Sequence, residues 1–144
     1  MKKTISVIVV LFMLVIAGCT NNSAMNIQYW DVKEIQSIPL LEWIDNNKAN
    51  GLYLSHNKTE STIYLYVNYS TDDTYGAGSV SIRFNNINKA VVINTVKKID
   101  SNTNSKLPEE AYEKLFTIDY GNKKVKKVNL NDKDFKLSDI MEIY

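Results

Sequence analysis

The sequence predicts an α+β domain with a mostly antiparallel sheet of about five to six strands, one N-terminal helix and one short helix. Three observations lead to this prediction. Apolar residues recur at every second position through much of residues 51–130, which is the period of β-strands. Polar turn-forming segments separate these stretches, and strands do not alternate with helices as in a doubly wound fold. Because the chain is rich in hairpin signals, a small open β-barrel of the lipocalin kind is the alternative.

The N-terminal helix is predicted over residues 38–47. Ser37 takes the N-cap position, Pro39 is tolerated in the first turn, and Asn50-Gly51 marks the end of the helix. Its apolar residues, Trp43 among them, recur at helical spacing. We therefore expect this helix to cover one face of the sheet.

Strands are predicted over residues 51–55, 62–69, 79–84 and 90–99. Along the second strand, aliphatic residues occupy one face, and Tyr64 and Tyr66 point outward on the other. In the third strand Arg83 belongs to the polar, outward face. The fourth has apolar residues on both faces, which favours a central place in the sheet.

The second half of the chain predicts the short helix and one more hairpin. Residues 108–115 begin with proline and two acidic residues, as a helix start prefers. Residues 116–120 then alternate ahead of the turn signal Gly121-Asn122. We expect residues 123–130 to return as the second arm of a hairpin with residues 116–120.

Composition limits the classes of function. The chain has 144 residues, 17 Lys+Arg against 16 Asp+Glu, one His and one Cys. A single His and a single Cys cannot form a Cys/His zinc site, and one Cys cannot form an intramolecular disulfide. A net charge of +1 gives no electrostatic reason to expect nucleic acid as a partner. We expect one small domain that holds neither metal nor other cofactor.

Residues 1–18 have the order of an export signal. Lys2 and Lys3 come first, and an apolar run of twelve residues from Ile5 to Ile16 follows, interrupted by a single serine. A helix of that length is about 18 Å long, whereas the hydrocarbon layer of a membrane is about 30 Å thick. The run therefore fits targeting better than permanent spanning.

The segment Ile16-Ala17-Gly18-Cys19 resembles the lipobox of bacterial lipoproteins, in which an aliphatic residue and two small residues precede a cysteine. The resemblance implies that residues 1–18 are a lipoprotein signal peptide and that Cys19 carries a diacylglyceryl group. The protein is then lipid-anchored to the cell membrane on its extracytoplasmic face. Residues 19–26 are the lipidated cysteine and a flexible spacer, and residues 27–144 form a single globular domain.

No set of reactive side chains converges, so we expect no enzymatic activity. His56 follows Ser55 directly, and neighbouring residues of a strand face opposite sides, so we interpret it as a surface histidine. Asp132 and Asp134 lack the glycine and glutamate of a helix–loop–helix calcium site. The lysines of residues 123–127 are interpreted as a solvated edge strand, with an anionic lipid surface as the alternative.

A second resemblance concerns the segment Tyr75-Gly76-Ala77-Gly78-Ser79-Val80-Ser81-Ile82, together with Trp43 and residues 51–53, 62–66 and 91–93. It resembles the glycine-containing turn and following strand of the PrcB-type domains of bacterial surface lipoproteins. In that resemblance Gly78, Ser79, Val80 and Ile82 match closely. It implies a related fold and an association with a partner protease.

These observations predict an anchored extracytoplasmic lipoprotein that binds a protein partner through Tyr64, Tyr66 and Arg83. Tyrosine and arginine are common in recognition surfaces because they offer a rigid ring or a planar charged group. One alternative is a lipocalin-like binder of a small molecule or lipid, which requires an internal cavity of about 300 Å³ or more. The other, implied by the second resemblance, is an accessory subunit of a surface protease.

Overall fold

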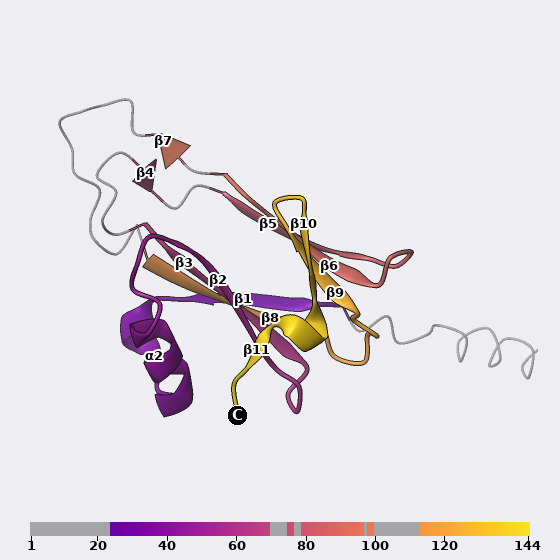
Figure 1. Cartoon of the computed structure of the whole chain (residues 1–144), viewed down its shortest axis with the longest axis horizontal. Coiled ribbons are helices and arrows are strands. Elements are labelled where there is room, and N and C mark those ends of the chain that lie inside the picture. The colour runs from indigo at the N-terminus through magenta and orange to yellow at the C-terminus, as the bar shows by residue number, and fades with distance from the viewer. Residues whose placement is uncertain (1–23, 70–74, 77–78, 97, 100–112) are drawn as a thin grey trace, which may run out of the picture.

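The computed structural model describes residues 24–69, 75–76, 79–96, 98–99 and 113–144 (Figure 1). These residues form two main β-sheets, a two-stranded ribbon and one α-helix. The five-stranded sheet has the order β1 (Asn26–Trp30), β8 (Glu113–Asp119), β3 (Thr62–Asn68), β2 (Gly51–Asn57) and β11 (Met141–Glu142). The four-stranded sheet has the order β10 (Lys133–Lys136), β9 (Lys127–Leu130), β6 (Ala90–Thr95) and β5 (Val80–Asn85). The ribbon pairs β4 (Tyr75–Gly76) with β7 (Lys98–Ile99).

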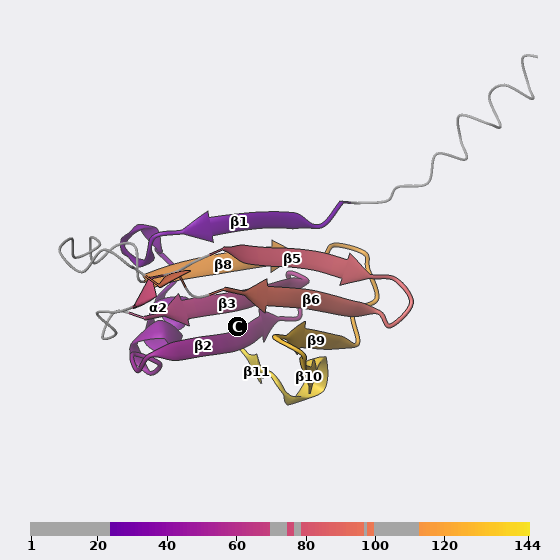
Figure 2. The same ribbon diagram turned by 90° about the horizontal axis from the view of Figure 1, so that it is seen from above.

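The molecule has three layers. Figure 2 shows β5 and β6 lying over β8 and β3, and Figure 1 shows helix α2 (Ile38–Asp45) on the other side of the five-stranded sheet. One apolar cluster fills the space between the two sheets, with Leu65 of β3 and Ile93 of β6 fully buried. A second cluster lies between α2 and the five-stranded sheet and includes Trp43 and Leu115. The middle of the five-stranded sheet is thus covered on both faces.

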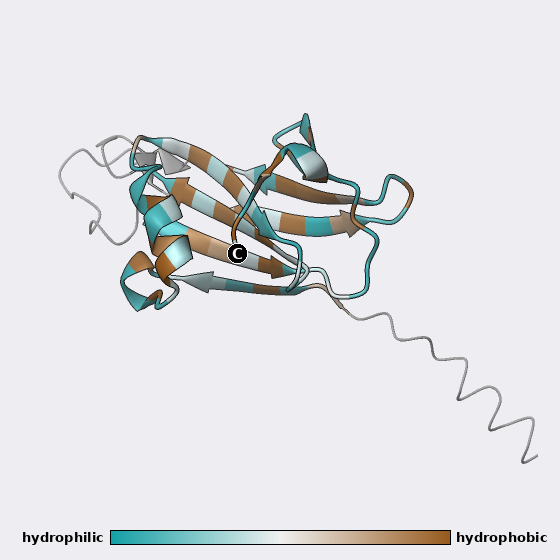
Figure 3. Ribbon diagram, turned by 60° about the horizontal axis from the view of Figure 1, so that its bottom comes forward, coloured by the Kyte–Doolittle hydropathy of each residue, from teal (hydrophilic) through white to brown (hydrophobic). Residues whose placement is uncertain are grey.

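This covering explains the composition of β3, whose seven residues are all buried. Aliphatic residues such as Ile63 and Leu65 face the four-stranded sheet, while Tyr64 and Tyr66 face the helix. Figure 3 shows hydrophobic residues as brown bands that alternate with paler or teal ones along the strands. The two-residue period is therefore a correct indicator of strands in this part of the chain.

The α+β class is confirmed in outline, although the structure is mostly β and its strands are divided between two main sheets. Both main sheets are mixed, because β11 runs parallel to β2 and β9 runs parallel to β6, whereas the other described pairs are antiparallel. The described strands do not close into a barrel, and side chains of the first cluster occupy the space between the sheets. The barrel alternative is therefore wrong for the described residues.

The helix over residues 38–47 and the strands over 51–55, 62–69 and 79–84 are confirmed with small shifts at their ends. The strand predicted over 90–99 is shorter, because β6 ends at Thr95 and β7 pairs separately with β4. The strand β1 begins at Asn26, inside the segment predicted as spacer. Two 3-10 turns, Val32–Glu34 and Leu137–Asp139, complete the described elements.

The prediction of a helix over residues 108–115 is wrong at its end, because residues 113–115 belong to β8, whereas residues 108–112 lie outside the described part of the chain. Leu115 pairs with both Trp30 and Tyr66 and is buried beneath α2. Burial at the centre of a sheet outweighs the weak helix preference of the preceding acidic residues.

The hairpin predicted between residues 116–120 and 123–130 is also wrong. After Tyr120 the chain turns at Gly121, which has a φ of 50°, and crosses from one sheet to the other. The strand β9 then pairs with β6 and β10 instead of β8. Val128 and Leu130 are buried between the sheets, which makes the crossing favourable.

Candidate interaction site

Tyr64 and Tyr66 do not form the exposed face that the sequence predicted. The Tyr66 side chain is 0% exposed and Tyr64 is 9% exposed, because α2 covers this face of the sheet. The Trp43 ring meets the Tyr66 ring edge-on with a centroid separation of 6.1 Å, and Tyr53 stacks on Tyr66 at 6.0 Å. The two predicted interaction tyrosines are therefore core residues.

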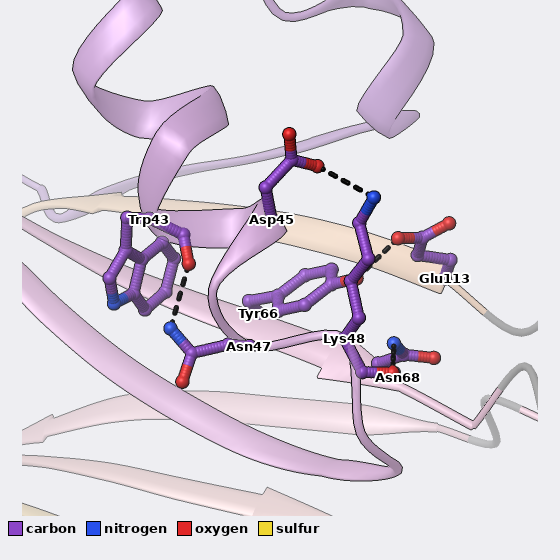
Figure 4. Close-up of polar contacts among 7 residues, drawn as sticks. All are labelled: Trp43, Asp45, Asn47, Lys48, Tyr66, Asn68 and Glu113. Atoms are coloured by element: carbon purple, nitrogen blue, oxygen red, sulfur yellow. Dashed lines mark hydrogen bonds and ion pairs between the residues drawn. The ribbon is translucent and has the colours of Figure 1, made fainter.

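The hydroxyl group of Tyr66 donates a hydrogen bond to the carboxylate of Glu113 at the margin of this cluster (Figure 4). Around it, the Asn68 side chain donates to the carbonyl oxygen of Lys48 at 2.9 Å, and the Asn47 side chain donates to the carbonyl oxygen of Trp43 at 2.7 Å. Burial, followed by the hydrogen bond to Glu113, raises the pKa of Tyr66 well above its ordinary value. The Asn68 contact joins the segment after α2 to the sheet, the Asn47 contact closes the end of the helix, and the Tyr66–Glu113 contact joins β3 to β8, so all three are structural.

Arg83 is exposed, as predicted, but it lies on β5 in the four-stranded sheet. The structure therefore does not bring it together with Tyr64 and Tyr66. Cross-strand pairing places Arg83 in one row with Val92, Asn129 and Asp134 on the outer face of that sheet. The Asn129 side chain donates a hydrogen bond to the Asp134 carboxylate at 2.8 Å. Some polar groups of this face are therefore already hydrogen-bonded to one another.

The strand β1 is the most open element of the five-stranded sheet. It pairs with β8 along one edge, and no described strand pairs with its other edge. All five side chains of β1 are exposed, with Tyr29 at 72%. Natural edge strands commonly carry lysine, proline or a bulge that prevents pairing with another chain. The β1 sequence, Asn-Ile-Gln-Tyr-Trp, contains no charged residue and no proline.

Beside β1, on the helix side of the sheet, lies an open groove of about 580 Å³. Gln28 and Trp30 of β1 form one side, and the segment leading into α2 forms the other. The Trp30 indole N–H donates to the hydroxyl oxygen of Thr117 at 3.2 Å, which holds the ring at the groove margin. The floor consists of Tyr64 and Leu115 together with Thr62 and Thr117, so it is partly apolar and partly polar.

The charged groups of this groove are all carboxylates among the described residues, namely Glu34, Glu60 and Asp119. The hydroxyl of Tyr64 donates to Glu60 at 3.3 Å, and Asp119 accepts from the backbone N–H of Gly121 at 2.8 Å. Burial, with the nearby Glu60 charge as a further cause, raises the pKa of Tyr64. A partly apolar floor beneath negative charge suits a ligand with lysine, arginine or amide groups.

A second hollow, of about 690 Å³, contains His56. The interpretation of His56 as a surface residue is wrong, since it is 6% exposed and lies within β2. Ser55 faces the opposite side, as expected, and its hydroxyl donates to the carbonyl oxygen of Met141 at 2.8 Å. The Nδ1 atom of His56 is buried without a hydrogen-bond partner among the described residues. Lys58, Lys123 and Lys124 also line this hollow.

Some predicted features lie outside the described residues or were missed. Cys19 precedes the described part of the chain, and so does the whole segment over 1–18. The edge strand β1 was missed, although the alternation of Ile27 and Tyr29 with Gln28 is visible in the sequence. The described residues contain no group of three or more His, Cys, Asp or Glu side chains arranged to hold a metal ion. No described helix has the length and hydropathy needed to cross a bilayer.

No known protein family, curated protein or solved structure matches this sequence.

Proposed function

We propose that the protein is a lipid-anchored extracytoplasmic module that binds an extended segment of a partner protein at the free edge of β1. The observation that carries the proposal is the outer edge of this strand, which has no charged residue and pairs with no strand in the part of the chain that the structure describes. Addition of a strand to an exposed sheet edge is a common mode of peptide recognition, because main-chain hydrogen bonds supply affinity and neighbouring pockets supply specificity.

The two sides of β1 define what the partner segment must look like. Side chains of an added strand alternate in the same way as those of β1. One set then lies beside Ile27 and Tyr29, and the other set lies at the groove beside Gln28 and Trp30. The carboxylates Glu34 and Glu60 favour basic or amide side chains in the second set. The expected partner segment alternates apolar with basic or amide residues.

The anchor stands close to this edge in the sequence. Cys19 precedes Asn26, the first residue of β1, by seven positions. A lipid-modified cysteine there holds the β1 edge near the membrane surface, where membrane proteins expose their extracytoplasmic segments. The resemblance to PrcB-type domains makes a surface protease one such partner.

The edge is tested by photo-crosslinking in intact cells, with benzoylphenylalanine placed at Tyr29 or, as the comparison, at Arg83. We expect a protein adduct at Tyr29 that is absent at Arg83, and the crosslinked peptide should come from one extended segment. A synthetic peptide of that segment should bind the wild type, and Tyr29→Lys should weaken its binding at least tenfold. Equal adducts at both positions, or unchanged peptide binding by Tyr29→Lys, contradict the proposal.

The anchor is tested separately with Cys19→Ala. Because the thiol is the group that receives the lipid, this variant should lose labelled fatty acid and leave the membrane fraction. Incorporation of radiolabelled palmitate and partition into a detergent phase measure the two effects. Fatty-acid labelling that persists in Cys19→Ala contradicts the assignment of the lipidated residue.

A further inference from the structure

The N-terminal segment joins the domain at one defined end of the sandwich. Cross-strand pairing puts Asn26, Asp119, Thr62 and Asn57 in a single row across four strands. We call this the tether end. Figure 2 shows that the start of β1 and the turn between β5 and β6 lie at this same end. Seven residues reach at most about 25 Å, so an anchor at Cys19 keeps the tether end near the bilayer.

The hollow around His56 opens at the tether end. His56 and Lys58 flank Asn57 in the sequence, and Tyr120 follows Asp119. Val125, Leu137 and Ile140 supply apolar surface to the same hollow. Among the described residues, its charged rim consists of Lys58, Lys123 and Lys124 together with one carboxylate, that of Glu142. This carboxylate accepts a hydrogen bond from the Tyr144 hydroxyl at 3.2 Å. The rim is therefore positive.

His56 places a buried nitrogen atom without a hydrogen-bond partner among the described residues at this hollow. His56 is only 6% exposed, and its Nδ1 atom has no hydrogen-bond partner within the described residues. A buried polar atom without a partner is costly, and natural structures seldom keep one without a reason. An anionic oxygen bound in the hollow supplies an acceptor for an imidazole N–H group.

The neighbouring turn carries a second feature suited to a membrane surface. Ile87, at the tip between β5 and β6, is 92% exposed. Lys89 closes the turn, and its carbonyl oxygen accepts the backbone N–H of Lys126 at 2.9 Å, which joins the turn to the lysine-bearing segment. The tether end also carries Glu60, in the turn between β2 and β3, and Asp119, so its charge is mixed outside the hollow itself.

We propose that the tether end rests on anionic phospholipid, with a phosphate headgroup held in the His56 hollow and Ile87 entering the interface. His56 donates to a phosphate oxygen, Lys58 and Lys124 neutralise the charge, and Val125 and Leu137 contact the carbon chain near the headgroup. This inference rests on the proposed lipid anchor. It adds a second contact with the membrane, so the Cys19 anchor sets the location of the domain and the bound phospholipid sets its orientation.

The test uses the single histidine as a spectroscopic probe. The lipidated protein, purified from membranes after labelling with ¹³Cε1-histidine, is placed in nanodiscs of phosphatidylcholine alone or with phosphatidylglycerol. We expect the His56 resonance to shift when phosphatidylglycerol is present. The triple variant Lys58→Gln, Lys123→Gln and Lys124→Gln should lose this shift. A matched triple variant, Lys33→Gln, Lys48→Gln and Lys133→Gln, should keep it, because these lysines lie away from the hollow.

The possible outcomes separate the sources of the ligand. Inorganic phosphate added to the phosphatidylcholine discs should leave the resonance in place, and a shift there assigns the hollow to a soluble anion and overturns the lipid proposal. Protein present in both kinds of disc with an unchanged resonance overturns this inference alone. Protein absent from both kinds of disc contradicts the anchor, and the inference falls with it.

Discussion

Among single residues, Tyr66 connects the helix layer to the central sheet. Its ring lies between those of Trp43 and Tyr53, and its hydroxyl donates to Glu113. Glu113 belongs to β8, the neighbour of β3. One side chain thus contacts α2, two strands and a carboxylate at the margin of the cluster.

Tyr66→Phe keeps the ring and removes the hydroxyl group. Because a hydrogen bond to a charged group contributes about 1.5–3 kcal/mol, we expect the free energy of unfolding to fall by about 2 kcal/mol. Urea unfolding followed by tryptophan fluorescence measures the change. In a Glu113→Gln background the same substitution should cost less, and equal losses in both backgrounds would show that the Tyr66–Glu113 pair contributes nothing.

The buried tyrosines also make stability depend on alkaline pH. Burial raises the pKa of Tyr64, Tyr66, Tyr69 and Tyr120 in the folded protein. These raised pKa values contribute to the free energy of unfolding. The contribution is fully present below pH 10, the approximate pKa of tyrosine in the unfolded chain, and is lost as the pH rises above it, because the unfolded chain then releases protons that the folded chain retains. We expect stability to fall above pH 10 by up to about 1.4 kcal/mol per pH unit for each such tyrosine. Urea midpoints between pH 8 and 11 measure the loss, and a flat profile would contradict it.

The sequence predicted which strand face carries each side chain, but it did not predict which faces are covered. Tyr64 and Tyr66 do lie opposite Ile63 and Leu65. Alternation within a strand contains no information about a helix packed from elsewhere in the chain, so the sequence alone predicts an exposed tyrosine face. The burial of His56 is unpredictable for the same reason, since the C-terminal strand β11 pairs with β2 at this residue from a distant part of the sequence.

Of the elements, α2 has a sharply divided surface. Ile44 is 1% exposed, whereas Ile38, on the same helix, is 70% exposed. The helix begins after Ser37, which occupies the expected N-cap position but makes no side-chain capping hydrogen bond. Packing of the apolar face therefore contributes more to the position of this helix than its cap does.

Ile44→Ala and Ile38→Ala form a matched pair on this helix. Removing a buried aliphatic side chain leaves a cavity and costs about 2–5 kcal/mol, so Ile44→Ala should strongly destabilise the protein. Ile38→Ala should change the free energy of unfolding by less than about 0.5 kcal/mol, as is usual at exposed sites. Thermal unfolding by circular dichroism distinguishes them, and similar losses would contradict the described placement of α2.

The longer elements were predictable because the spacing of apolar residues within each one indicates a strand or a helix. The strands β3, β5 and β6 show two-residue alternation or continuous burial, and α2 has both helical spacing and end signals. The two-residue strand β11 is too short to show a period. The position of Leu115 in β8 depends on pairing with Trp30, which is distant in the sequence, so local preferences indicated a helix instead.

On the scale of the whole molecule, the C-terminal segment joins the two apolar clusters. Ile140 belongs to the cluster between the sheets, and Ile143 belongs to the cluster beneath α2. The backbone N–H of Ile143 donates to the carbonyl oxygen of His56 at 2.8 Å. The segment between them forms β11, the edge strand parallel to β2.

Deletion of residues 140–144 should therefore weaken both clusters at once. Loss of two buried isoleucines with their backbone hydrogen bonds is expected to lower the free energy of unfolding by more than about 3 kcal/mol. Deletion of Tyr144 alone, which is 85% exposed, is the control and should have little effect. Denaturant unfolding compares the two, and equal stability of both truncated proteins would contradict the bridging role.

The pairing of β1 with β8 has a consequence for how the protein is made. The Trp30–Thr117 hydrogen bond joins positions 87 residues apart, so the first strand to leave the ribosome has no partner until most of the chain has been synthesised. A nascent chain shorter than about 120 residues carries Ile27 and Tyr29 without their neighbours on β8. Among the described strands, the one nearest the N-terminus is thus among the last to find its place in the sheet.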